Sequence, residues 1–391
     1  MHGERLTERC RQDLLRRNAV FEGFFQRETG RLAEACHKMS RRFLANGRLL
    51  AFGSGAATTD AQHVSVEFVH PVIVGKRALP ALDLGLDFEA RLPVLVRSDD
   101  MVMGFAFPGP DAAVERALSV ARARGALTFA LAGEAEYSFA PPDGDPFICQ
   151  EIFECLYHVL WETVHVFFEH REQGHDVGAS AFLYPFLGRK EQGLENVVAE
   201  VQESMRQKCE QVNQLRTAAA ETEAEAMAEI AQRIAERVAR GGKVIAFGNG
   251  GSATDANDFV ADCVMPPAGW TALPALSLAA EPANITAIAN DIGSEAVFAR
   301  QLIAHAQPTD IAVSFSTSGN SANILAALAE AQKRGLLTVG IVGYDGGKIV
   351  SERLVDGALV IRSDYIPRIQ EAQASVYHVL RAGIEECLKE R

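Results

Sequence analysis

The hydrophobic positions of this chain alternate between short continuous runs and longer stretches with helical spacing. Continuous apolar runs such as 244–247 suit strands that are buried on both faces, and most are followed by a stretch with apolar residues every three or four positions. Strands that alternate with helices predict an α/β fold with a parallel sheet flanked by helices. The predicted strands are 49–53, 79–84, one within 95–125, 127–132, 243–248, 273–278, 310–315 and 337–342.

Two long polar stretches precede these strands. Residues 4–46 are rich in Arg, Glu, Leu and Ala, and their apolar residues have helical spacing, which predicts one or two long amphipathic helices. Residues 194–240 repeat this pattern. Further helices are predicted at 146–170, 322–335 and 367–389.

The chain contains an internal duplication. Residues 49–63 match a second stretch in which Gly248 stands 195 positions after Gly53. The tetrapeptide Leu-Pro-Ala-Leu at 79–82 recurs at 273–276, and the displacement between the copies grows along the chain, which indicates insertions in the second copy. The duplication predicts two domains, at 1–170 and 194–391, joined by a linker over 171–193 that docks on a domain.

Composition narrows the class of protein. The chain has 391 residues, of which 48% are hydrophobic and 23% charged, and this balance is typical of globular domains that need no membrane span. Its net charge of −13 argues against non-specific binding of nucleic acid. Its seven cysteines form no Cys-x-x-Cys pair, and its first residues lack an apolar signal region. We therefore expect reduced thiols and a cytoplasmic location.

The strand at 243–248 ends in a glycine turn that opens a helix. Gly248, Gly250 and Gly251 allow the backbone to turn sharply and to approach a ligand closely. Ser252 and Thr254 then place hydroxyls where the N–H groups and the dipole of a helix start favour an anion. The turn predicts a phosphate site.

A second hydroxyl-rich loop, residues 316–321 (Ser-Thr-Ser-Gly-Asn-Ser), follows the strand at 310–315. Both loops belong to the carboxyl edge of the predicted sheet, where α/β proteins bind ligands, although serines also cap helices. A sugar phosphate is the expected ligand, and no nucleotide cofactor is expected because the Walker lysine motif is absent. In the first copy the loop 106–111 has no hydroxyl, and Asp111 would repel phosphate.

The first copy holds a different set of polar residues. His63 and Glu67 are four residues apart on one predicted helix, and Gln150 and His158 are eight residues apart on another. Two imidazoles, a carboxylate and an amide oxygen are compatible with zinc or a similar divalent ion, although a single histidine on a helix is more often simply packed or exposed.

These motifs together resemble the sugar isomerase (SIS) domain and, within it, the phosphoheptose isomerase family. The residues that carry the resemblance are GNGGSATDANDF at 248–259, STSGNS at 316–321, DGGK at 345–348, and RIQE at 368–371 with His378 beyond it. The resemblance covers nearly all of both copies. It implies tandem three-layer domains of the flavodoxin-like or Rossmann-like type, and isomerisation of sedoheptulose 7-phosphate at sites near subunit contacts. It also implies a zinc set of His, Glu, Gln and His, in which the Glu and the last His act as acid and base.

Residue by residue, the resemblance implies a metal set in the first copy and a substrate set in the second. The metal set is His63, Glu67, Gln150 and His158, with Glu67 and His158 as acid–base candidates. The substrate set is Asn249, Gly250, Ser252, Asn290, Asp291, Ser316, Thr317, Ser318, Ser321 and Gln370.

The second copy departs from the family at its metal positions. They read Asp258, Asp262, Gln370 and His378, which makes Asp262 and His378 a second acid–base pair. Two aspartates suit harder ions than zinc, so we expect zinc in the first copy and weaker or no metal binding in the second. An arginine of the family is replaced by Pro71 and Pro266.

The sequence thus predicts a sugar-phosphate aldose–ketose isomerase that acts on a heptose phosphate and forms a homodimer of four domains. The alternative is a non-catalytic SIS protein that binds a sugar phosphate as a regulator or adaptor. Two roles remain open for the first copy: a structural partner, or a contributor of metal-bearing helices to a composite site.

Overall fold

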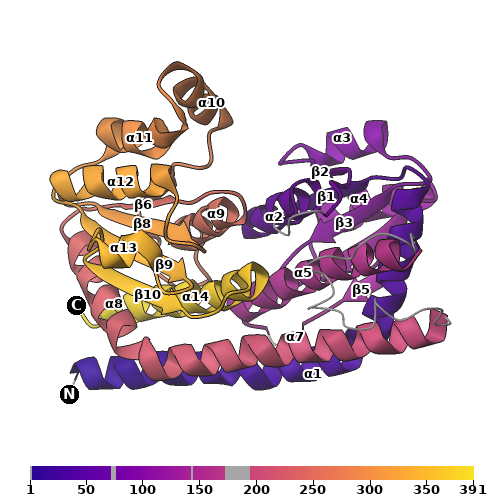
Figure 1. The fold of residues 1–391 in the computed structure, drawn as a ribbon, viewed down its shortest axis with the longest axis horizontal. Helices are drawn as coiled ribbons and strands as arrows, with labels where there is room; N and C mark the ends of the chain where they lie inside the picture. Colours follow the sequence, from indigo (N-terminus) through magenta and orange to yellow (C-terminus); the bar gives the residue numbers. More distant parts are fainter. Residues whose placement is uncertain (1, 72–75, 142–143, 172–193) are drawn as a thin grey trace. The chain divides into compact units, whose positions relative to one another are not determined.

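Two five-stranded sheets form the framework of the protein (Figure 1). The structure is a computed structural model that describes residues 2–71, 76–141, 144–171 and 194–391. All strand pairs in both sheets are parallel, and the two strand orders, β2-β1-β3-β4-β5 and β7-β6-β8-β9-β10, are equivalent. The predicted α/β fold with two parallel sheets flanked by helices is confirmed. Of the predicted linker 171–193, all but Arg171 lies outside the described residues.

The elements of the first copy alternate as the hydrophobic pattern predicts. They are α1 (His2–Leu44), β1 (Leu49–Gly53), the short helix η1 (Gly55–Ala57), α2 (Thr58–Val69), β2 (Ala81–Asp83), α3 (Phe88–Leu95), β3 (Met101–Phe105), α4 (Ala112–Ala123), β4 (Leu127–Leu131), β5 (Tyr137–Phe139) and α5 (Pro146–Arg171).

The second copy repeats this order with additional helices after its second strand. Its elements are α7 (Leu194–Thr222), α8 (Ala224–Ala239), β6 (Val244–Phe247), α9 (Gly251–Val264), β7 (Ala275–Ser277), α10 (Pro282–Asp291), η3 (Ser294–Ala296), α11 (Val297–His305), β8 (Ile311–Ser316), α12 (Ala322–Lys333), β9 (Leu337–Gly343), α13 (Gly347–Ser351), β10 (Gly357–Ile361) and α14 (Ile366–Lys389).

Two strands, β5 and β10, were not predicted from the sequence. Each lies at an edge of its sheet and pairs with one neighbour. β5 has only three residues and includes Ser138, so it shows no continuous apolar run. β10 does contain one, residues 358–361 after Gly357, but this run was not interpreted as a strand. Edge strands need less apolar surface than central strands, which weakens the pattern that would predict them.

Each central strand supplies residues to two hydrophobic cores, one on each face of its sheet. In β6, Val244 and Ala246 belong to one core, whereas Ile245 and Phe247 belong to the other. β1 divides its residues between two cores in the same way. This alternation follows from the two-residue period of a strand, and it explains why both central strands are continuously apolar.

The two compact units of the chain are not contiguous in sequence. One, the first-copy unit, comprises residues 19–211, and the other, the second-copy unit, comprises residues 1–18 and 212–391. The helices α1 and α7 therefore each contribute to both units. This division differs from the predicted domains, 1–170 and 194–391, because amphipathic spacing predicts a buried helix face without indicating the core that buries it.

The exchanged helix segments are part of the cores. Leu6, Cys10 and Leu14 from α1 are buried in the core that contains β6 and α14. In the first-copy unit, Val201, Met205 and Cys209 from α7 are buried in the core that contains β1 and α5. At the point of exchange, the side-chain amides of Asn18 and Asn213 donate to each other's backbone carbonyl oxygens, each at 3.3 Å.

Two findings bear on the remaining composition-based predictions. Among the described residues, no helix is both long enough and apolar enough to cross a membrane. All seven cysteines are buried, and none forms a disulfide within the part of the chain described. The reduced state of these thiols stays a prediction.

The helix exchange predicts that a substitution in α1 destabilises the unit of the second copy. Leu14→Ala should cost about 2–5 kcal/mol of unfolding free energy because it leaves a cavity in that core. Leu15→Ala is the control, since Leu15 is 39% exposed, and should cost less than about 0.5 kcal/mol. Urea unfolding monitored by Trp270, with Trp161 replaced by Phe, reports the second-copy unit. A companion protein with Trp270 replaced by Phe reports the first-copy unit through Trp161, and a loss of stability seen only in that background would contradict the exchange.

Candidate functional site

The glycine turn of the second copy forms as the sequence predicts. Gly250 has a φ of 56°, a conformation that side chains rarely adopt, and α9 begins at the next residue. Ser252 is buried on the first turn of α9, and the hydroxyl of Thr254 donates to the backbone carbonyl of Gly251 at 2.6 Å. The helix start thus presents N–H groups, the positive end of a dipole and one serine hydroxyl.

The loop 316–321 has a folded backbone that orients its hydroxyls. The Ser316 oxygen accepts a hydrogen bond from the Gly319 N–H at 3.0 Å, and the Ser318 oxygen accepts one from the Asn320 N–H at 3.3 Å. Each hydroxyl keeps its own proton to donate to a ligand. Gly319 is required here because its φ is 63° and an added Cβ would lie 2.2 Å from the Gly346 carbonyl oxygen.

A reciprocal amide pair joins the two loops. The Asn249 side chain donates to Asn323 at 2.9 Å and accepts from it at 2.8 Å. Asn249 follows β6, whereas Asn323 lies on the first turn of α12, so the pair holds the glycine turn against the start of α12. Asn323 was not predicted as a site residue. Its signal was its place two positions after Ser321, at a helix start.

Beyond the two hydroxyl-rich loops, α9 and α14 bring together two aspartates and a histidine. His378 Nε2 lies 3.4 Å from Asp258 Oδ2 and 3.3 Å from Asp262 Oδ2, and all three side chains are at least 97% buried. Tyr377 donates its hydroxyl proton to Asp258 at 2.7 Å. The predicted pair of Asp262 and His378 is thus in contact, although its catalytic role stays a prediction.

The environment of Asp262 alters its acidity. Burial and the neighbouring Asp258 charge raise the pKa of Asp262 to about 7, and the contact with His378 opposes the rise. A carboxyl group with a pKa near neutrality can both accept and return a proton at physiological pH. The cluster can therefore perform acid–base chemistry.

Three predicted substrate residues lie elsewhere. Asn290 and Asp291 are exposed at the end of α10, and the Asn290 amide donates to Asp291 at 2.8 Å. Gln370 is buried on α14, and its Oε1 has no hydrogen-bond partner among the described residues. The roles of these three residues in substrate binding stay predictions.

In the first copy the corresponding anion position is occupied by the chain itself. Asp111, which matches Ser321, caps α4 by accepting from the N–H groups of Ala113 and Val114 at 2.8 and 3.1 Å. The Ser54 hydroxyl also donates to Asp111, at 3.1 Å. These bonds, led by the one from Val114, hold the pKa of Asp111 below its usual value. Asp111 thus supplies the negative charge that a phosphate would bring to this helix start.

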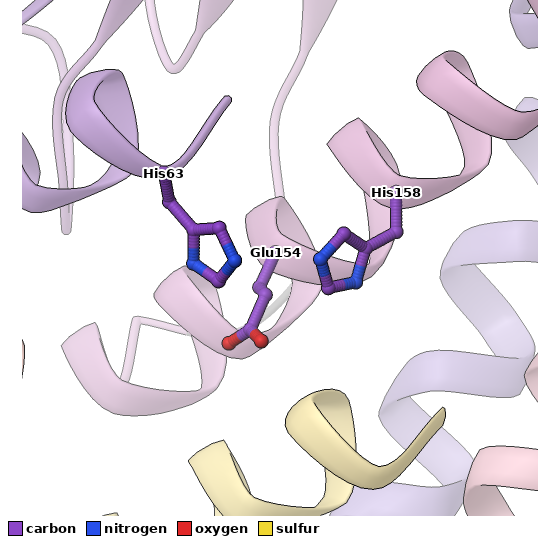
Figure 2. A group of neighbouring side chains, drawn as sticks. All are labelled: His63, Glu154 and His158. Carbon is purple, nitrogen blue, oxygen red and sulfur yellow. The ribbon is translucent and has the colours of Figure 1, made fainter. Parts of the chain in front are cut away.

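The polar residues of the first copy lie on α2 and α5, where Figure 2 shows His63 facing Glu154 and His158. One potential ligand atom from each of these three buried residues lies within 4.8 Å of the others. Glu67, predicted as a ligand, lies 3.8 Å from His63 but does not belong to this group of three. Glu154 was not predicted, and its signal was its spacing of four residues from both Gln150 and His158.

This donor set fits zinc. Two imidazoles and a carboxylate are common protein ligands of zinc, and an amide oxygen can complete the set. Gln150 donates from Nε2 to the Thr59 hydroxyl at 3.3 Å, which leaves Oε1 without a hydrogen-bond partner among the described residues. A buried acceptor of this kind suits a metal ion, so the residues present are compatible with the expected cofactor.

Comparisons with known proteins support the resemblance seen in the sequence. A family model described as the SIS domain matches residues 208–343. The phosphoheptose isomerase of Nitratiruptor is 44% identical over 145 residues, which are 37% of this chain and 76% of that protein. The phosphoheptose isomerase of Solidesulfovibrio magneticus is 43% identical over 159 residues, which are 39% of this chain and 74% of that protein.

One solved structure matches both copies. The C-terminal domain of glucosamine-fructose-6-phosphate aminotransferase from Francisella tularensis aligns with a TM-score of 0.59 over 96% of each chain, at 9% sequence identity. At this identity the match establishes the tandem fold alone.

Asp111 and Ser321 stand at matching N-cap positions, but only Asp111 makes a side-chain cap hydrogen bond. We therefore predict that replacing them by alanine lowers the unfolding free energy by different amounts. Asp111→Ala should lower the unfolding free energy by about 1 kcal/mol, because two N–H groups lose their acceptor. Ser321→Ala should change it by less than about 0.5 kcal/mol, because the Ser321 side chain makes no cap hydrogen bond. Because the pKa of Asp111 is lowered, its contribution is present at neutral pH and is lost as pH falls through the folded value. Equal costs in urea unfolding at neutral pH would contradict this assignment.

Proposed function

Because this chain belongs to the SIS domain family, we propose that its second domain binds a sugar phosphate and interconverts its aldose and ketose forms. The substrate class we propose is a heptose phosphate, on the basis of the similarity to the phosphoheptose isomerases. Because the matches to these relatives cover under two fifths of this chain, the proposal concerns the second domain rather than the whole chain.

The observation that carries the proposal is the arrangement of polar residues along α9. Ser252, in the first turn, belongs to the phosphate site, and Asp258 and Asp262 on the same helix contact His378. At 1.5 Å per residue, the rise along α9 from Ser252 is about 9 Å to Asp258 and about 15 Å to Asp262, which is the scale of an extended phosphorylated sugar. A single helix thus supplies both a group for the phosphate end of the substrate and acid–base groups for its other end.

Phosphate recognition relies on neutral donors. The proposed donors are the hydroxyls of Ser252, Ser316, Thr317, Ser318 and Ser321, together with N–H groups at the starts of α9 and α12. Hydrogen bonds to a charged phosphate are stronger than neutral ones, and the dipoles of both helices add to the attraction.

The chemistry assigned to the cluster is proton transfer between adjacent carbons. Ionised Asp262 removes the proton from the carbon next to the carbonyl, and an enediol forms. Asp262 then returns the proton to the other carbon, while His378 moves a proton between the two oxygens. Overall, one proton moves from carbon to carbon, another moves from oxygen to oxygen, and the carbonyl group shifts to the neighbouring carbon. The reaction therefore needs no external oxidant or reductant.

We assign the first domain a structural role. Its anion position is filled by Asp111, so a phosphate would meet a negative charge there. We propose that zinc binds in this domain, held by His63 and His158 with carboxylate and amide oxygens; when bound, zinc supplies a positive charge that neutralises a carboxylate and links helices.

The phosphate assignment predicts a loss of affinity in Ser318→Ala. Removing one hydrogen bond to a charged phosphate costs about 1.5–3 kcal/mol, which corresponds to a loss of about 10-fold or more. Isothermal titration with sedoheptulose 7-phosphate and with inorganic phosphate measures the affinity. Ser351→Ala, an exposed serine on α13, is the control and should bind as the parent does. Unchanged affinity in Ser318→Ala would sink the assignment.

The catalytic assignment predicts that Asp262→Asn abolishes turnover but preserves phosphate binding. The loss should be about 10²–10⁴-fold, as is usual for a general base. In the parent protein, turnover should rise with pH through about 7, because the base must be ionised. Asp258→Asn should move this rise to lower pH, since it removes a charge that raises the pKa. Phosphate binding without any turnover by the parent protein would instead favour the regulatory alternative.

A further inference from the structure

The buried residues that cluster in the first domain differ from the metal set that the sequence resemblance implies. In Figure 2, His63 projects from α2 toward two residues of α5, Glu154 and His158. All three side chains are at least 97% buried, and their potential ligand atoms lie within 4.8 Å of one another. Tetrahedral zinc with bonds of about 2.0–2.2 Å places its ligand atoms about 3.3–3.6 Å apart, so small side-chain movements are enough to bind the ion.

Glu154 is better placed than Glu67 to provide the carboxylate. Glu154 stands one helical turn before His158 on the same face of α5, so these two side chains approach one point from the same helix. Glu67 lies 3.8 Å from His63, but it is not one of the three residues whose ligand atoms all lie within 4.8 Å of one another. Glu67 therefore contacts one member of the group, whereas Glu154 is close to both histidines.

The fourth donor is indicated by Gln150. It lies one turn before Glu154 on α5 and donates to Thr59, which lies one turn before His63 on α2. The amide is thus held between the same two helices that carry the other three residues. Its Oε1, without a hydrogen-bond partner among the described residues, can accept a metal ion.

The second domain shows that this carboxylate is specific to the first. His378 stands 220 positions after His158, and at the same displacement Glu154 is matched by Ala374. His63 is matched by Asp258, which already accepts from Tyr377 and contacts His378. The first domain therefore has a carboxylate at this position of α5, whereas the second domain has alanine there and carries its acids, Asp258 and Asp262, on α9.

We propose that the first domain binds zinc through His63, Glu154 and His158, with the Gln150 amide oxygen as fourth ligand, and that the ion links α2 to α5. Four protein donors close the coordination sphere, which is the arrangement of structural rather than catalytic zinc. The ion also compensates for the burial of a carboxylate between two imidazoles. This inference rests on the zinc of the proposed function but not on isomerase activity.

The first experiment measures zinc content in the full-length protein by elemental analysis after equilibration with buffered zinc. The parent should hold one ion per chain, and Glu154→Gln should bind zinc at least 10-fold more weakly. Glu151→Gln is the matched control, because Glu151 is also 99% buried on α5 but lies outside the group. It should bind zinc as the parent does, and so should Glu67→Gln. A loss of zinc in Glu67→Gln with full retention in Glu154→Gln would overturn the proposal.

The second experiment detects the ligand directly and does not depend on a loss. In the cobalt-loaded protein, Glu154→Cys should add a thiolate-to-cobalt charge-transfer band that the parent spectrum lacks, because a coordinating thiol is deprotonated. Glu67→Cys and Glu151→Cys should leave the parent spectrum unchanged. A new band in Glu67→Cys alone would refute the role of Glu154.

The results of these metal-binding experiments can be distinguished from the results of the isomerase assay. Neither the zinc content nor the cobalt spectrum involves a sugar substrate. The expected metal pattern in a protein without turnover would leave this inference standing and reject the isomerase activity. Turnover in a protein whose Glu154→Gln variant binds zinc as tightly as the parent would reject the inference alone.

Discussion

The starts of two helices meet at the carboxyl edge of each sheet, and the positive charge gathered there must be neutralised. In both copies a side-chain hydrogen bond joins the turn after the central strand to the start of the neighbouring helix. Ser54 and Asp111 form this bond in the first copy, and Asn249 and Asn323 form it in the second. Only the first copy supplies a carboxylate of its own. The second leaves uncharged hydroxyls, which favour an anionic ligand without replacing it.

This one difference accounts for much of the divergence between the copies. A domain whose anion position is filled internally does not gain a phosphate, so its acid–base residues lose their substrate. The helices that would hold such residues can then serve another purpose, and in the first copy they bring two histidines and Glu154 together. In the second copy, the matched helices hold Asp262 next to His378, and the pKa of Asp262 is raised to about 7.

The predictions from the sequence succeeded where a local pattern determines the result. Continuous apolar runs located the central strands, and glycines followed by hydroxyls located the helix starts. Asp111 was expected to repel phosphate; the structure adds that the carboxylate caps a helix, which depends on backbone geometry. Glu154 was not predicted because the ligand set was taken from the positions that match the family, and Glu154 is not one of them.

The remaining features depend on contacts between distant segments. Asn290 and Asp291 match the family, but a motif does not specify where an additional helix places them, so their role stays a prediction. The same holds for the homodimer, because a single chain shows no partner. The sequence also did not predict which core buries each segment of α1 and α7, because the helical spacing of apolar residues is the same whichever core they enter.

The exchange of helix segments offers a physical reason for keeping a domain that lacks an open phosphate site. The core of the second-copy unit includes Leu6 and Leu14, which precede the whole first copy in sequence. The core of the first-copy unit includes Val201 and Met205, which begin the second. Deleting the first copy together with its leading helix would remove buried side chains worth roughly 1.5–3 kcal/mol each from the second. Because folded domains are stable by only about 5–15 kcal/mol, a few such losses are enough to threaten the fold. The core of the second-copy unit therefore depends on the helix segment that precedes the first copy, so the two copies stay linked through α1 whether or not the first one keeps a phosphate site.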